Sequence, residues 1–229
     1  IKYEDVLAEL SGNMDLYNEY HCKTQDLLRL WVKQGKRILF EGAQGSMLDI
    51  DHGSYPYVTS SSTTAGGLSS GLGVGPRHLD SIIGITKAYT TRVGEGPFAT
   101  ELFDSNAEHL AKVGHEFGAT TGRPRRCGWL DLKALETIVF INSVSNLCLT
   151  KLDVLDSFEE IKVCIDYDDT QQPIYKTFSG WKQDTSKARS FEDLPKAAQD
   201  YILFIEETLD CPVGIVSVGP SRDQTIYRD

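Results

Sequence analysis

The sequence lacks any pair of cysteines close enough together to form a simple metal site. Its cysteines number five, which is odd, and they lie far apart at Cys22, Cys127, Cys148, Cys164 and Cys211. This excludes a simple disulfide framework and a Cys-x-x-Cys metal site. Cys148 and Cys164 lie within apolar runs, which is typical of core thiols in a reducing compartment.

The sequence is also poor in positive charge and has no long apolar segment. Its 229 residues include 23 lysines and arginines against 33 acidic residues, so the formal net charge is −10. A protein that coats nucleic acid needs a basic stripe, which argues against a nucleic-acid partner. No apolar run approaches the roughly 18 residues of a membrane span, and the polar residues 1–5 do not resemble a signal peptide. We therefore expect a cytoplasmic protein with no membrane partner.

Helix-like and strand-like segments alternate along the chain. Apolar residues at helical spacing predict a helix over 2–33, which Gly35 ends, and a short strand at 37–41. A second helix is expected over 76–89, where a proline stands at the start, and Asp131 is expected to cap a third. Further strands are predicted at 146–150, 161–165 and 213–218, and a further helix at 194–209. This alternation predicts an α/β fold, with residues 1–229 in a single domain.

A long segment rich in Gly, Ser and Thr occupies residues 42–75. Loops longer than about 15 residues are usually functional or disordered, and the apolar and aromatic residues scattered through this one argue against disorder. Gln44 follows the predicted strand directly, where α/β proteins place ligands. Six consecutive hydroxyl residues at 59–64 can hydrogen-bond a phosphate or a sugar. No Gly-Lys-Ser/Thr sequence is present and no strand precedes Gly71–Gly75, which excludes a Walker A loop and a dinucleotide fingerprint.

Three arginines, Arg123, Arg125 and Arg126, follow the small residues 119–122. A guanidinium binds carboxylate or phosphate through a planar, two-pronged fork. In an acidic protein such a cluster indicates either a pocket for a small anion or a solvated basic turn. Arg126 is expected to face away from the ligand, because a cysteine and the predicted helix start follow it closely.

The predicted strand 146–150 leads into Lys151-Leu152-Asp153. Guanine presents its N1–H and its 2-amino group side by side, so one carboxylate at Asp153 can accept both hydrogen bonds while the lysine stem lies along the base. Adenine lacks this donor pair. The segment Ser217–Pro220 also follows a predicted strand and is expected to form a second wall for the same base or its ribose.

Taken together, these segments resemble the adenylosuccinate synthetases. The resemblance runs along nearly the whole chain and rests on Phe40–Gly45, Asp49–Ser61, Thr91–Phe98, Ala119–Arg125 and Thr150–Asp153. It implies a fold related to the P-loop GTPases, with a central, largely parallel sheet and long ligand-binding loops. It also implies a homodimeric enzyme of purine biosynthesis that uses GTP and Mg²⁺ to join IMP and L-aspartate.

The resemblance further implies a role for each matching residue. Gln44, which also stabilises the oxyanion, would bind IMP together with Thr59, Val93, Gly94 and Arg123; aspartate would be bound by Thr121, Arg123 and Arg125; and GTP would be bound by Arg125, Lys151, Asp153, Ser217, Gly219 and Pro220. The family's phosphate loop, its catalytic Asp and His, and its Mg²⁺ ligands lie near the N-terminus of the full enzyme and match nothing here. The chain therefore looks like the C-terminal half of the enzyme or slightly more, and we expect it to be inactive alone.

Two other functions stay open at this point. The chain could be a regulatory module that binds guanine nucleotides without ligase activity, or an interaction domain whose loops are relics. The presence of Gln44, Thr59, Arg123 and Arg125 favours the enzyme, because a GTP switch needs no pocket for IMP or aspartate. The resemblance also implies that most bacterial relatives carry a longer insertion at the connection Asp166–Pro173, so this chain has either a natural deletion there or a loop that this sequence omits.

Overall fold

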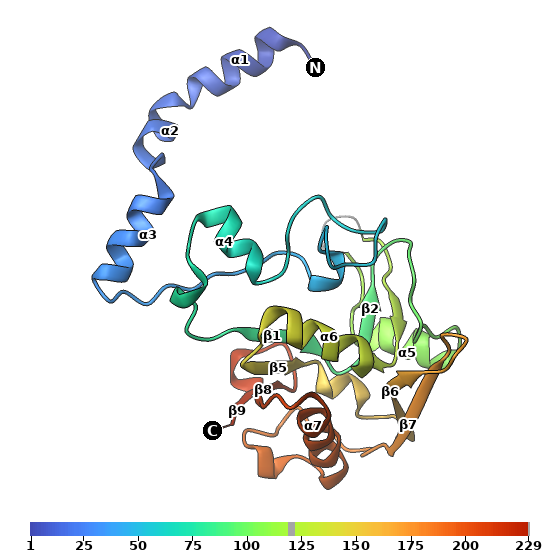
Figure 1. The fold of residues 1–229 in the computed structure, drawn as a ribbon. Coiled ribbons are helices and arrows are strands. Elements are labelled where there is room, and N and C mark those ends of the chain that lie inside the picture. The colour runs from blue at the N-terminus through green and yellow to red at the C-terminus, as the bar shows by residue number, and fades with distance from the viewer. Residues whose placement is uncertain (119–121, 229) are drawn as a thin grey trace.

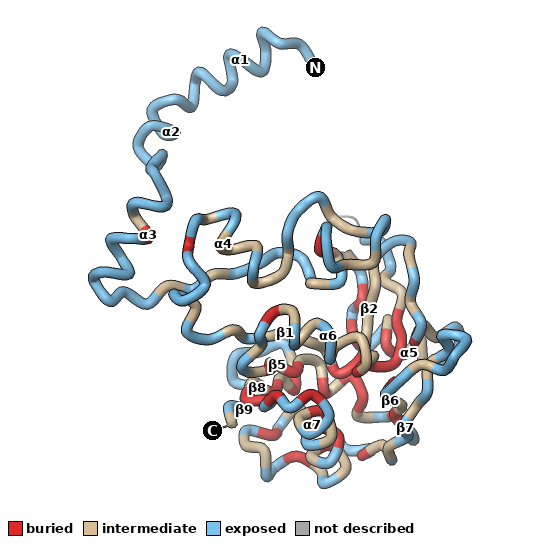
Figure 2. Tube along the Cα trace, viewed as in Figure 1, coloured by how far each residue is buried: buried red, intermediate tan, exposed pale blue. Residues whose placement is uncertain are grey.

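The computed structural model describes residues 1–118 and 122–228. Helices α1 (Tyr3–Gly12), α2 (Met14–Tyr20) and α3 (Thr24–Lys33) project from an α/β body (Figure 1). The helical prediction for 2–33 is thus confirmed, with breaks between the three helices. Helices α1 and α2 bury no residue (Figure 2), and α3 buries only Leu28. Gly35 has a φ of 64°, a left-handed conformation that suits the chain just past a helix end.

The central sheet has the strand order β1-β5-β8-β9. Strand β5 (Asn146–Thr150) pairs in parallel with both β1 (Ile83–Lys87) and β8 (Val213–Ser217), and β9 (Thr225–Tyr227) runs antiparallel to β8. The structure confirms the predicted strands at 146–150 and 213–218 and the largely parallel sheet. Because β1, β5 and β8 run in the same direction, their carboxyl ends meet at one edge, where ligands bind in open α/β sheets.

The prediction of a helix over 76–89 is wrong. Only the short 3₁₀ turn Pro76–His78 forms at the proline; residues 83–87 of the segment form β1, and β2 (Thr90–Arg92) follows just beyond it. Three of the five residues of β1, Ile83, Ile85 and Thr86, are β-branched, and such residues favour strands. A Cβ on Gly84 would lie 3.0 Å from Val144 Cγ1, so the chain packs closely here. The expected strand at 37–41 is also wrong, because the structure pairs this segment with no described strand.

Two smaller sheets flank the central one. Strand β6 (Glu160–Tyr167), which contains the predicted strand 161–165, pairs in parallel with β4 (Leu130–Asp131) and antiparallel with β7 (Pro173–Ser179). Strand β2 pairs antiparallel with β3 (Arg126–Gly128). Asp168 closes the β6–β7 hairpin by accepting hydrogen bonds from the amides of Thr170 and Gln172. The short connection 166–173 is therefore a compact hairpin turn.

Helices α5 (Ser105–Val113), α6 (Leu132–Asn142) and α7 (Lys196–Leu209) complete the body. Asp131 caps α6 as predicted, with its carboxylate accepting from the Ala134 amide at 3.0 Å, and the predicted helix 194–209 is α7. The core joins these helices to the sheets through fully buried residues such as Leu110, Leu149, Ile161, Tyr201 and Ile205. The remaining short elements are Ser46–Leu48, α4 (Gly66–Leu72), Leu152–Leu155, Phe191–Asp193 and Arg222–Gln224. Among the described residues, no helix has the length and apolar character needed to cross a membrane.

Candidate functional site

The two predicted walls of the guanine site lie at one edge of the central sheet. Lys151 and Asp153 follow β5, and the segment Ser217–Pro220 begins at the last residue of β8. The register of these parallel strands, with Leu149 opposite Val216, places the two segments next to each other. The Ser217 hydroxyl donates to the Gly219 carbonyl oxygen at 2.9 Å and so fixes the turn after β8.

The carboxylate of Asp153 has an unused acceptor at this edge. Its Oδ1 atom is buried and accepts no hydrogen bond from the described part of the chain. Burial raises the pKa of Asp153, and the nearby Lys151 acts in the opposite direction. Leaving a buried acceptor unpaired costs roughly 1–3 kcal/mol. A ligand that brings N–H donors, as guanine does, would satisfy this atom.

A second carboxylate, Glu116, forms the centre of a buried cluster beside the guanine site. Its side chain is 0% exposed and accepts hydrogen bonds from Lys87 Nζ at 2.9 Å, Tyr89 Oη at 2.6 Å, Arg125 Nη1 at 2.7 Å and Lys151 Nζ at 2.9 Å. Burial alone would raise the pKa of Glu116, but these four hydrogen bonds lower it to about 2. Three cations thus surround one carboxylate, and the cluster carries excess positive charge.

Arg125 reaches this cluster from the stem of the predicted aspartate loop. Residues 116–118 pair with 123–125: the Arg125 amide donates to the Glu116 carbonyl at 2.9 Å, and the Gly118 amide donates to the Arg123 carbonyl at 2.8 Å. The Arg125 guanidinium points back to the Glu116 carboxylate, whereas Arg123 is exposed. Thr121, the third residue predicted to bind aspartate, lies outside the described residues.

Arg92 ties together two segments that carry predicted IMP residues. Its guanidinium donates to Ser54 Oγ at 2.9 Å and to the Glu95 carbonyl at 3.0 Å. The first contact lies in the loop that leads to Thr59, and the second lies in the turn that contains Val93 and Gly94. This turn needs glycine at position 96, where φ is 107° and a Cβ would lie 2.8 Å from the Cβ of Tyr57. Val93 is exposed, as is Gln44 at the start of the long loop.

Arg126 does not join the Glu116 cluster that holds Arg125, and its expected orientation away from the ligand stays a prediction. Its guanidinium pairs with the Glu101 carboxylate and donates to the carbonyl oxygens of Gly94 at 3.1 Å and Gly96 at 2.9 Å. The small residues around this turn expose their carbonyl groups, and strand β3 aims the arginine toward them. Arg126 therefore holds the turn that presents Val93 and Gly94.

Asp49 organises the long loop and was missed in the sequence. It is 1% exposed, and burial would raise its pKa, but hydrogen bonds from four backbone amides lower it to about 2. These amides belong to Asp51, His52, Thr63 and Thr64. The Thr63 hydroxyl also donates to the Gly45 carbonyl at 3.0 Å. Part of the predicted hydroxyl run therefore serves the loop itself, while Thr59 is held by its amide on the Leu48 carbonyl at 2.8 Å.

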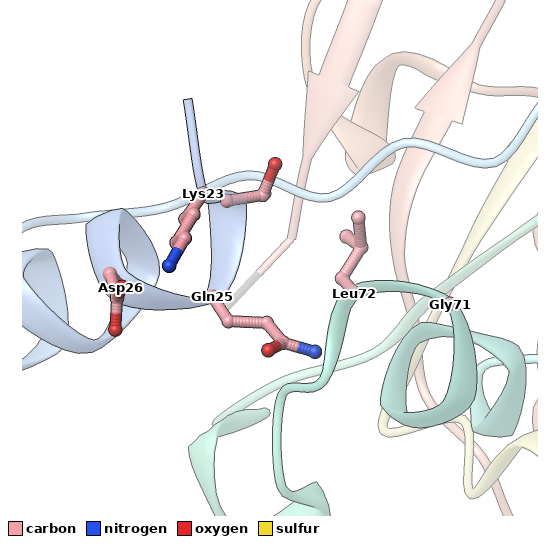
Figure 3. Close-up of a pocket in the computed structure, with 6 residues that line it drawn as sticks. Lys23, Gln25, Asp26, Gly71 and Leu72 are labelled. Carbon is pink, nitrogen blue, oxygen red and sulfur yellow. The ribbon is translucent and has the colours of Figure 1, made fainter. Parts of the chain in front are cut away.

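Two further features, possible metal-binding groups and a surface hollow beside α3, were compared with the residues predicted to bind substrate. Among the described residues, no group of three or more His, Cys, Asp or Glu side chains could hold a metal ion, so none of them is assigned to Mg²⁺. A hollow between α3 and α4 contains none of the residues predicted to bind substrate (Figure 3); it is lined by Lys23, Thr24, Gln25, Asp26, Gly71 and Leu72.

Comparisons with known proteins agree on one family. Residues 1–226 match the sequence model of a family described as adenylosuccinate synthetase. The chain is 54% identical over 241 residues to the adenylosuccinate synthetase of a Psychrobacter species and 57% identical over 243 residues to that of a Marinomonas species. It covers 56% of each relative, and each alignment covers 99% of the chain.

A solved structure is similar to this chain over nearly the whole length of this chain. It is described as fully ligated adenylosuccinate synthetase from Plasmodium falciparum, and the comparison gives a TM-score of 0.89 at 38% identity. The match covers 99% of this chain and 63% of the other. The chain thus spans a little more than half the length of the proteins that it resembles.

Proposed function

The chain belongs to the adenylosuccinate synthetase family, and on that premise we propose that it forms the IMP, aspartate and guanine sites of a GTP-dependent ligase. The complete enzyme would join IMP and L-aspartate to form adenylosuccinate, with GTP and Mg²⁺, as a cytoplasmic homodimer. Residues 1–229 would be one part of its α/β domain. The shorter length of the chain relative to its relatives supports this division.

The unpaired Oδ1 atom of Asp153 is the observation that carries the proposal. It is buried, with no donor among residues 1–118 and 122–228, at the edge where Lys151 and Pro220 also lie. A guanine base supplies the two adjacent donors that a carboxylate can accept, and the 2-amino group distinguishes it from adenine. The excess positive charge around Glu116, close to this edge, suits substrates that carry phosphate or carboxylate groups.

The proposed reaction proceeds in two steps. The 6-oxygen of IMP attacks the γ-phosphorus of GTP, which releases GDP and forms 6-phosphoryl-IMP. The aspartate amine then attacks C6, and phosphate leaves with the former 6-oxygen. In this scheme Gln44 hydrogen-bonds the 6-oxygen, and Arg123 and Arg125 hold the aspartate carboxylates through bidentate contacts. The acid and base groups come from outside this chain, so we expect residues 1–229 alone to form no adenylosuccinate.

The test is the product analysis of the full-length protein. Incubation with IMP, aspartate and GTP should yield adenylosuccinate and GDP in equal amounts, and omission of either IMP or aspartate should abolish both products. A protein that binds GTP but forms no adenylosuccinate under these conditions would instead be a guanine-nucleotide-binding module.

A further inference from the structure

The two oxygens of the Glu116 carboxylate connect two different substrate sites. Oε2 accepts from Arg125 Nη1 at 2.7 Å, and Oε1 accepts from Lys151 Nζ at 2.9 Å. Arg125 belongs to the stem of the predicted aspartate loop, whereas Lys151 follows β5 in the predicted guanine site. Both cations therefore form ion pairs with the same fully buried carboxylate.

Glu116 is also part of the loop stem through its backbone. Its carbonyl oxygen accepts from the Arg125 amide at 2.9 Å, so one residue holds both the main chain and the side chain of Arg125. Lys151 is constrained as well, because its ammonium also donates to the Gly114 carbonyl and its φ of 60° is left-handed. A shift of either cation therefore changes the geometry available to the other.

We infer that Glu116 is a positioning residue that couples aspartate binding to guanine binding. The inference rests on the proposed function. Glu116 contacts no substrate in this account. Its carboxylate fixes the positions of Arg125 and Lys151 through the hydrogen bonds that it accepts from them. Without its negative charge, three neighbouring cations would repel one another and lose their common partner. Coupling between two sites is reciprocal, so occupation of the guanine site would favour the aspartate-binding position of Arg125, and the reverse.

The experiment uses Lys151→Met in the full-length enzyme, with and without Glu116→Gln. Lys151 is assigned to the base and not to aspartate, so the dependence of its effect on Glu116 shows whether the coupling passes through that carboxylate. Initial rates are measured against aspartate at saturating IMP and GTP. We expect Lys151→Met to raise the KM for aspartate by about 10-fold in the wild-type background, which lies within the usual range of coupling between sites. In the Glu116→Gln background the same change should alter it by less than about twofold.

Glu206→Gln is the control for loss of an ion-paired carboxylate elsewhere in the protein. Glu206 pairs with Arg228 at 2.7 Å and accepts from the Val213 amide at 2.7 Å, on α7 and away from the cluster. Its substitution should lower the thermal midpoint without raising the KM for aspartate. If Glu206→Gln raises that KM as much as Glu116→Gln does, the effect is one of general stability and the inference is overturned.

The other outcomes of the Lys151→Met experiment also test the coupling. An unchanged KM for aspartate in Lys151→Met overturns the coupling, and so does an equal effect of Lys151→Met in both backgrounds. If Glu116→Gln does not fold, the effect of Lys151→Met is compared in the Lys87→Met and Glu116→Gln/Lys87→Met backgrounds instead, since the second background has one fewer unpaired cation than Glu116→Gln. Wild-type protein that forms no adenylosuccinate would instead refute the proposed function.

Discussion

The guanidinium of Arg126 donates a hydrogen bond of 3.1 Å to the carbonyl oxygen of Gly94. Together with the contact to Gly96, this bond fixes the turn that presents two of the predicted IMP residues. The three arginines within residues 123–126 thus have different surroundings: Arg123 is exposed, Arg125 binds Glu116, and Arg126 holds a turn.

Arg126→Leu should therefore weaken the use of IMP more than the use of aspartate. The change removes the donors to the Gly94 and Gly96 carbonyls and leaves the Glu101 carboxylate without its partner. Steady-state kinetics of the full-length enzyme should show a larger rise in the KM for IMP than in that for aspartate. A selective rise in the KM for aspartate would place Arg126 in the aspartate site instead.

Arg123→Leu should mainly damage the use of aspartate. It removes a charge-assisted fork from a substrate with two carboxylates, and such bonds are roughly twice as strong as neutral ones. Arg125→Leu should raise the KM values for both aspartate and GTP, because Arg125 also binds Glu116. Lysine at position 123 should rescue only in part, since a point charge cannot reproduce the bidentate geometry. Full rescue by lysine would contradict a bidentate contact between Arg123 and an aspartate carboxylate.

Asp153→Asn should lower the affinity for GTP and raise the use of XTP. The amide turns a donor toward the base, which opposes the guanine 2-amino group but suits the 2-oxo group of xanthine. Loss of a charged acceptor costs about 1.5–3 kcal/mol, or roughly 10- to 100-fold in affinity. Asp184→Asn is the matched control, because Asp184 is exposed and lies close enough to influence Asp153 electrostatically. Equal effects of the two variants on nucleotide choice would show that Asp153 does not contact the base.

The thermal stability of the protein should fall in acid between about pH 4.5 and pH 2. The pKa values of Asp49 and Glu116 are each about 2 in the folded protein, against ordinary values of 3.8 and 4.5. The unfolded chain therefore binds protons that the folded chain excludes, so this stabilisation is present above the ordinary pKa values and is lost as the pH falls toward 2.

Asp49→Asn should lower the thermal midpoint at pH 7, because an amide cannot accept from four backbone donors as the carboxylate does. It should also make the midpoint depend less on pH between 4.5 and 2. Thermal unfolding followed by circular dichroism measures both effects. An acid profile identical to that of the wild type would show that Asp49 is not a source of the stabilisation.

The parts of the fold that the sequence predicted were those that depend on local pattern. The buried strand before Lys151 and the cap at Asp131 can be recognised from a few neighbouring residues. Strand β1 could not, because its conformation depends on parallel pairing with β5, about sixty residues later, whereas Pro76 and its apolar neighbours matched a helix. Long-range pairing prevailed over local propensity.

The same distinction explains which site residues were missed. Glu116 receives hydrogen bonds from three segments, at residues 87–89, 125 and 151, that only the fold brings together. Lys87 is the last residue of β1, at the edge of the sheet where Lys151 follows β5. A correct prediction of β1 would therefore have placed Lys87 beside the guanine site. Asp49 begins a turn that contains Gly53, and an aspartate at the start of a turn is a local signal that its side chain accepts hydrogen bonds from the backbone amides that follow, as it does here from Asp51.

The transfer of oxygen from IMP tests the central claim most directly. IMP carrying oxygen-18 at position 6 is converted by the full-length enzyme in the presence of GTP and aspartate, and the released phosphate is analysed by mass spectrometry. The account predicts that the label appears in the phosphate, because the 6-oxygen attacks the γ-phosphorus and leaves with it. Label that is released as water, or that stays in the nucleotide while GTP is hydrolysed, would contradict it.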